Sequence, residues 1–176
     1  MRRVIHAPCP LCKADIEYLY QTEEIPYFSE ILLITAGCSC GYHLADTVIL
    51  NEGDPVRWTL TVEGGDDLNA RVVRSTSGRV EIPEFGVLIE PGPICDAYIS
   101  NVEGVLARVE DVLNMALGWA EEEDERARNL ELQERVRKAR EGTEPFTLII
   151  EDLSGNSAII SPKAEKTILK MPEADV

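Results

Sequence analysis

The chain has 176 residues, a length that fits one domain or one domain with a small module, and its 17 basic and 32 acidic residues give a net charge of −15. This balance argues against a nucleic-acid-binding function, which needs a basic surface to neutralise phosphates, and favours a protein partner. No stretch is long and apolar enough to span a membrane, and the first six residues lack the apolar core of a signal peptide. We therefore expect a cytoplasmic protein whose thiols stay reduced.

Two pairs of cysteines lie near the start of the chain. Cys9 and Cys12 lie in PCPLC, and Cys38 and Cys40 lie in GCSCG. Each pair has Pro or Gly beside it, which is typical of a tight turn that presents two sulfurs on one side. Four thiolates on two turns suit a closed tetrahedral site for structural zinc. We therefore predict that these four cysteines bind zinc.

Other interpretations of the cysteines fit less well, and one detail of the ligand set stays open. Iron is the main rival, because a set of four thiolates also suits it. A disulfide framework conflicts with a reducing compartment, and a redox dithiol would need a helix that starts at Cys12, whereas residues 13–20 alternate like a strand. The second pair has C-x-C spacing, tighter than the usual C-x2-C, so His6 or His43 could replace one sulfur.

The predicted zinc ribbon covers residues 1–45. Its chain runs out along residues 13–20 and back along residues 30–35. A module this small buries little apolar surface, so the metal has to supply much of its folding free energy. The turn between the two strands carries Ile25, Pro26, Tyr27 and Phe28. An apolar turn of this kind either packs against the second domain or is an exposed contact for a partner.

The remainder of the chain, residues 46–176, predicts a β-rich domain, so that the fold class is mainly β (α+β). Short strands separated by turn residues are expected at residues 44–50, 56–62, 70–75, 79–82, 87–89, 147–152, 157–160 and 167–171. This spacing indicates an antiparallel sandwich or barrel. Residues 152–156 (DLSGN) are expected to form the turn of a tight hairpin, since Gly155 and Asn156 tolerate a positive φ.

A helical hairpin interrupts these strands at about residues 101–142. The sequence Ser100-Asn101-Val102-Glu103 is typical of a capping box, and apolar residues then recur at helical spacing from Val102 to Ala116. The next stretch begins with acidic residues 121–125 and becomes basic towards residue 140, which matches the macrodipole of a second, more exposed helix.

The residue types argue against an enzyme. Residues 44–176 contain no histidine, so the β-rich domain lacks the ligands of the usual metal-dependent centres. Cys95 has no neighbouring histidine in the sequence and is expected to be a buried small apolar residue. The sequence also contains no phosphate-binding glycine loop of the Walker or dinucleotide type.

Taken together, these stretches resemble the ZPR-type zinc-finger proteins. The matching segments, in the family's order, are residues 9–12 (CPLC), 25–31 (IPYFSEI), 40–42 (CGY), 57–62 (RWTLTV), 67–75 (DLNARVVRS), 82–84 (IPE), 147–152 (TLIIED) and 154–157 (SGNS). Eukaryotic members carry two modules in tandem, whereas this chain has one and is similar to the shorter archaeal form. The resemblance implies a zinc ribbon followed by a double-stranded β-helix or barrel domain with an inserted helical hairpin.

The resemblance also implies a function. The eukaryotic members of the family bind translation elongation factor 1-alpha and assist its folding, so the implied partner is the archaeal counterpart, a GTPase of that type. The metal-binding role carries over to Cys9, Cys12, Cys38 and Cys40. Our hypothesis for the partner contact is the turn at residues 25–28. The alternative is a zinc-ribbon accessory factor of transcription or of the ribosome.

Overall fold

The computed structural model describes residues 1–51, 53–92 and 95–170. The chain divides into two compact units, Met1–Glu52 and Gly53–Val176, which we call the ribbon unit and the body. The sequence placed the end of the ribbon at residue 45, inside a strand of the first unit.

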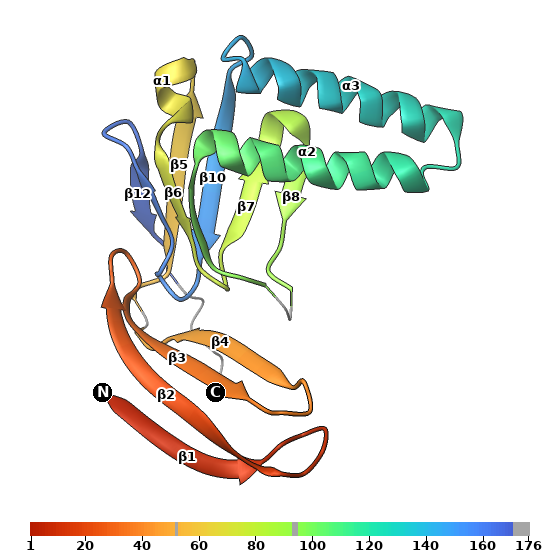
Figure 1. The fold of residues 1–176 in the computed structure, drawn as a ribbon. Helices are drawn as coiled ribbons and strands as arrows, with labels where there is room; N and C mark the ends of the chain where they lie inside the picture. Colours follow the sequence, from red (N-terminus) through yellow and green to blue (C-terminus); the bar gives the residue numbers. More distant parts are fainter. Residues whose placement is uncertain (52, 93–94, 171–176) are drawn as a thin grey trace, which may run out of the picture. The chain divides into compact units, whose positions relative to one another are not determined.

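The ribbon unit is one antiparallel sheet of four strands, which Figure 1 draws in red to orange. The strands follow the chain in the order β1 (Arg2–Pro8), β2 (Asp15–Ile25), β3 (Ser29–Gly37) and β4 (His43–Ile49). Strands β2 and β3 form the predicted hairpin. Strand β1 was not predicted, because RRVIHAP lacks a clean alternation of apolar and polar residues and reads as an irregular end.

The core of the ribbon unit is small and is built around the first cysteine pair. Cys9, Ile16 and Ala36 are buried together, with Tyr18 and Leu44 partly buried against them. Strand pairing explains this set, because Tyr18 lies opposite Ala36, which in turn lies opposite Leu44. A cluster of this size removes little apolar surface from water.

The body contains two antiparallel sheets. The larger sheet has the order β12-β5-β10-β7-β8, and the smaller sheet has the order β11-β6-β9. Their strands are β5 (Val56–Val62), β6 (Arg71–Arg74), β7 (Arg79–Ile82), β8 (Val87–Ile89), β9 (Tyr98–Asn101), β10 (Phe146–Asp152), β11 (Ala158–Ile160) and β12 (Glu165–Ile168). The strand spacing predicted an antiparallel sandwich or barrel, and this two-sheet arrangement is the first of these.

Alternating residues of the central strands fill the core of the body. On β10, Phe146, Leu148 and Ile150 are buried, and the first two lie opposite Val62 and Leu60 of β5. Val72 of β6 and Ile159 of β11 belong to the same buried cluster, so the core joins the two sheets. Each side chain of this kind contributes about 1.5–3 kcal/mol to stability when it is fully buried.

The inserted hairpin consists of α2 (Val102–Trp119) and α3 (Glu123–Arg140), which run side by side between β9 and β10 in the sequence (Figure 1). Helix α2 buries one face in the core of the body, through Val102, Val105, Leu106, Val109 and Leu113. Helix α3 buries only Val136 and Ala139. No helix of the described ranges is long and apolar enough to cross a membrane.

The start of α2 corrects one prediction. The N-cap is Asn101, whose side-chain oxygen accepts a hydrogen bond of 2.8 Å from the Gly104 backbone N–H. Ser100 was expected to cap the helix as the first residue of a capping box. It instead lies within β9, a strand that the sequence did not predict.

The turn after β10 corrects a second prediction. Gly155 does adopt a positive φ of 72°. However, β10 and β11 belong to different sheets, so residues 152–156 carry the chain from one sheet to the other and do not close a hairpin. Two further elements, α1 (Gly65–Leu68) and the 3-10 turn η1 (Pro83–Phe85), connect strands. Of the predicted last strand at residues 167–171, Met171 lies outside the described residues.

A buried carboxylate stabilises the connection between β10 and β11. Asp152 is fully buried and accepts hydrogen bonds from four serine hydroxyls, those of Ser75 (2.6 Å), Ser77 (2.7 Å), Ser154 (2.7 Å) and Ser157 (2.6 Å). Burial would raise the pKa of the Asp152 carboxyl, but these hydroxyls stabilise its charged form and hold the pKa below its usual range. The carboxylate therefore ties together the ends of strands from both sheets.

Candidate metal centre

The first cysteine pair lies on a turn between β1 and β2. The Cys9 N–H donates to the Ala14 carbonyl (2.7 Å), and the Lys13 N–H donates to the Cys9 carbonyl (3.0 Å). Lys13 has a positive φ of 64°, which closes the turn. Strand pairing of Pro8 with Asp15 anchors its base. The unpredicted strand β1 is therefore what positions Cys9.

The second cysteine pair lies on a tighter turn between β3 and β4. The Cys38 N–H donates to the Tyr42 carbonyl (2.9 Å), and the Gly41 N–H donates to the Cys38 carbonyl (3.0 Å). Gly41 has a φ of 94°, a conformation that other residues rarely adopt. This glycine explains how a C-x-C pair can turn its two sulfurs to the same side.

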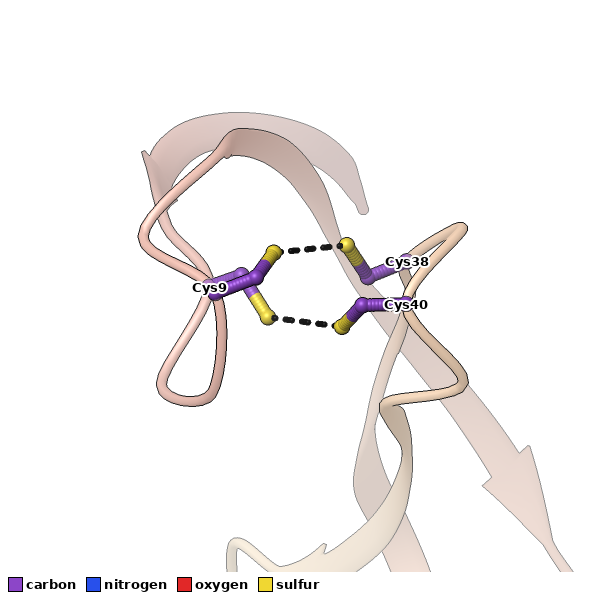
Figure 2. Close-up of side chains that lie close together, drawn as sticks. Cys9, Cys38 and Cys40 are labelled. Carbon is purple, nitrogen blue, oxygen red and sulfur yellow. Dashed lines mark hydrogen bonds between the residues drawn. The ribbon is translucent and has the colours of Figure 1, made fainter.

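The two turns bring all four sulfurs together. The Sγ atoms of Cys9, Cys12, Cys38 and Cys40 all lie within 4.8 Å of one another. The Cys9 and Cys40 sulfurs lie 3.7 Å apart, and the Cys12 and Cys38 sulfurs lie 3.5 Å apart. Figure 2 shows Cys9 on one side of a gap and Cys38 and Cys40 on the other. A tetrahedral zinc ion with Zn–S bonds of about 2.3 Å separates its sulfurs by about 3.8 Å. The arrangement therefore fits zinc with little movement.

The closeness of the four sulfurs shifts the pKa values of two of the thiols in opposite directions. Burial opposes ionisation of Cys9, but the backbone N–H groups of Cys12 and Leu11 and neighbouring thiols lower its pKa to about 7. At Cys40 the Tyr42 N–H favours the thiolate, yet the neighbouring sulfurs and burial together raise its pKa to about 12. Each thiolate raises the free energy of ionising the thiols beside it. A bound divalent cation would lower that free energy.

The two histidines have other partners. The Nδ1 atom of His6 lies 3.4 Å from a carboxylate oxygen of Asp15, and its Nε2 atom lies 3.8 Å from Glu17. The Nδ1 atom of His43 donates to the Leu44 carbonyl (3.2 Å). In the described part of the chain, the residues grouped as possible metal ligands are the four cysteines, without either histidine.

The predicted contact turn lies between β2 and β3 and is only partly exposed. Tyr27 is 42% exposed and has a φ of 76°, whereas Phe28 is 4% exposed. Pro26 is exposed and Ile25 is half-buried. Ile25 and Pro26 line an open hollow of about 610 Å³ together with Glu24 and Glu30.

Cys95 was predicted to be buried, and this prediction is wrong. Its side chain is half-exposed, and it does not belong to the four-cysteine cluster.

Comparison with known proteins finds similarity over both units of the chain. Residues 66–175 match the model of the ZPR1 jelly-roll domain. A ZPR1-like protein of Methanocaldococcus jannaschii is 40% identical over 178 residues, an alignment that covers 99% of this chain and 90% of that protein. The zinc finger chaperone zpr1 of Schizosaccharomyces pombe is 30% identical and the zinc finger protein ZPR1 of Bos taurus is 33% identical. These alignments cover 84% and 81% of this chain but only 33% and 32% of those proteins. The four-cysteine cluster is consistent with the zinc of such proteins.

Proposed function

Because the chain belongs to the ZPR1 family, we propose that it is a zinc-dependent protein-binding module that holds a GTPase of the elongation factor 1-alpha type and assists its folding or assembly. The observation that carries this proposal is the four-cysteine cluster of the ribbon unit in a chain similar to a protein named as a zinc finger chaperone. The proposed site of action is the cytoplasm.

In this proposal the zinc is structural. Cys9, Cys12, Cys38 and Cys40 are its four ligands, so no coordination position is left for a substrate or a water molecule. The metal would fix the two turns against each other and so hold the sheet of the ribbon unit in one conformation. The protein would act by binding and would not be an enzyme.

The proposed contact includes the turn at residues 25–28. Tyr27 is a large aromatic residue, and its positive φ is an uncommon and costly conformation for such a side chain. Conformations of this kind persist only where the surrounding structure holds them, and they cluster at functional sites. Tyrosine is also a frequent energetic anchor in protein interfaces. Ile25, Pro26 and Tyr27 would meet the partner, while the buried Phe28 would hold the turn.

The direct test is binding of a purified archaeal elongation factor 1-alpha to the zinc-loaded full chain, measured by calorimetry. We expect the wild-type chain to bind, and Tyr27→Gly to weaken binding about tenfold or more, which corresponds to the loss of about 1.4 kcal/mol. Glycine accepts a positive φ without strain, so this change should not lower the melting temperature. Val4→Ala, at an exposed apolar residue of β1, is the matched control and should bind like the wild type.

Two results would overturn the proposal. One is a zinc-loaded chain that fails to bind the elongation factor. The other is binding of RNA or DNA that falls steeply with salt, which would favour the accessory factor of transcription or of the ribosome.

A further inference from the structure

The ribbon unit has an open groove beside the second cysteine pair that the proposed function does not use. It has a volume of about 570 Å³, within the range of ligand sites in proteins. Leu19, Thr35 and Gly37 line it from the sheet, and Cys38 and Tyr42 line it from the turn. All its lining residues belong to the ribbon unit.

The groove exists because a strand ends in a residue without a side chain. Leu19 pairs with Thr35, and Gly37 pairs with His43, so these residues point to the same face of the sheet. A Cβ atom built on Gly37 would meet nothing within 4 Å. Gly37 is not among the residues with a positive φ, so its backbone conformation does not require glycine. We call this feature the Gly37 groove.

The chemistry of the Gly37 groove combines an apolar floor with hydrogen-bond acceptors. Leu19 and Tyr42 supply apolar and aromatic surface, and Glu17 supplies an exposed carboxylate. His43 donates from Nδ1 to the Leu44 carbonyl, which leaves its Nε2 atom as an acceptor in the neutral ring. His6 faces Glu17 at 3.8 Å from β1, a pair so exposed that it competes weakly with a cationic ligand.

The electrostatic surroundings favour a cation. In residues 1–51, acidic side chains outnumber basic ones by six to three. When the metal centre is filled, four thiolates outweigh one divalent cation, so negative charge remains next to Cys38. A ligand with a carboxylate or a phosphate would be repelled, whereas an ammonium or guanidinium group would be attracted.

We propose that the Gly37 groove binds an extended segment of the partner protein that carries a lysine or arginine two residues away from an apolar side chain, so that both side chains point to the same face. The apolar side chain fills the space over Gly37, and the cation reaches Glu17 and His43. This inference rests on the proposed function, because it identifies the kind of segment that the ribbon unit recognises.

The first test fills the groove. Gly37→Val places a β-branched side chain, which favours strand conformation, where the ligand would lie. We expect it to weaken binding of the elongation factor about tenfold or more, with unchanged zinc content. Thr47→Val places the same valine side chain at an exposed position on the same face of the sheet but outside the groove, and it should bind within about twofold of the wild type.

The second test reverses a charge, in case Gly37→Val disturbs the fold. Glu17→Lys changes an exposed side chain of the groove, and Glu23→Lys changes the same residue type on the same strand and face but outside it. We expect only Glu17→Lys to weaken binding about tenfold. Equal binding by Glu17→Lys and the wild type would overturn the inference.

A peptide probe separates this inference from the identity of the partner. Isotope-labelled, zinc-loaded chain is titrated with Ac-VAKAV-NH2 or with Ac-VAEAV-NH2, in which the valines and the charged residue share a face, and followed by NMR. We expect the lysine peptide alone to shift the amide signals of Leu19, Gly37 and Gly41, and Glu17→Lys to abolish the shifts. If this occurs while the elongation factor fails to bind, the assignment of the groove as a binding site is supported and the proposed function is wrong. Shifts of equal size with both peptides, or none with either, would overturn the groove assignment.

Discussion

The two units of this chain differ in what holds them together. Among the residues that the structure describes, the body has a cluster of eighteen buried apolar residues that joins both sheets and the helical hairpin. The corresponding cluster of the ribbon unit has three buried residues, one of which is the cysteine Cys9. One unit is therefore stabilised by burial of apolar surface, and we propose that the other depends on a zinc ion bound by its four cysteines.

On this proposal, the free energy of zinc binding stabilises the ribbon unit in place of a larger apolar core. Binding of a structural zinc ion contributes on the order of 10–16 kcal/mol in small metal-dependent modules, whereas a whole domain has a net stability of about 5–15 kcal/mol. The single sheet of the ribbon unit can thus leave apolar side chains such as Val4 and Tyr27 exposed and still fold. In our proposal the partner contacts the exposed side chains of the turn at residues 25–28, and Val4 lies outside that contact.

The largest expected effect is the loss of the ribbon unit on removal of zinc. A strong chelator should abolish hydrogen-exchange protection of β2 and β3, while β5 and β10 of the body stay protected. The measurement is exchange followed by mass spectrometry on the full chain, with zinc added back as the control. If both units lost or kept protection together, the division of stabilising forces between them would be wrong.

The reverse experiment weakens the body. Phe146 is 2% exposed and packs against Phe85, with ring centroids 5.5 Å apart. Phe146→Ala should lower the free energy of unfolding of the body by about 3–5 kcal/mol. Zinc content should not change, because the metal centre lies in the other unit. Denaturant titration with parallel zinc analysis measures both, and Leu153→Ala, at a residue that is 61% exposed, is the control.

The buried carboxylate of Asp152 makes the free energy of unfolding of the body depend on pH. The pKa of Asp152 is lower in the folded chain than in the unfolded one, so its stabilisation is complete above the usual aspartate pKa. The stabilisation is lost as the pH falls from about 4 through the folded value. Asp152→Asn should lower the free energy of unfolding by about 1–3 kcal/mol at pH 7 and flatten its decline in acid. Thermal melts between pH 3 and pH 7 test this, and an unchanged slope would contradict it.

The smallest effect concerns the helical hairpin. Arg140 of α3 forms ion pairs with Glu103 and Glu110 of α2, on a partly exposed surface. Arg140→Gln should cost about 1 kcal/mol or less, because surface ion pairs are screened by water and salt. The difference from the wild type should shrink in 1 M salt, where the screening length is about 3 Å. A loss above 3 kcal/mol would mean that these ion pairs contribute as much to stability as the buried side chains of the cluster.

The elements that the sequence predicted well are those with local signals. Strands β7 and β8 match their predicted ranges, since Val80 and Ile82 alternate with polar residues and Pro83 ends the run. The apolar positions of α2 that were read as one face are mostly its buried face. The cysteine turns also carry their own signal, because Pro and Gly stand beside the thiols.

The elements that the sequence missed depend on distant partners. Strand β1 forms because it pairs with β2, and its sequence RRVIHAP carries no local signal of a strand. Strand β9 is formed by pairing with Arg71–Arg74 and supplies the residue that caps α2. The crossing after β10 looked like a hairpin because Gly155 favours a tight turn. The hydrogen bonds from Ser75 and Ser77 to Asp152, which come from about 75 residues earlier in the chain, are invisible to local patterns.

X-ray absorption at the zinc edge of the purified full chain tests the central claim most directly, because it reports the ligands of the ion itself. We predict one zinc per chain surrounded by four sulfur atoms at about 2.3 Å, with no nitrogen ligand. A first shell containing a histidine nitrogen, or a folded ribbon unit without zinc, would contradict the account.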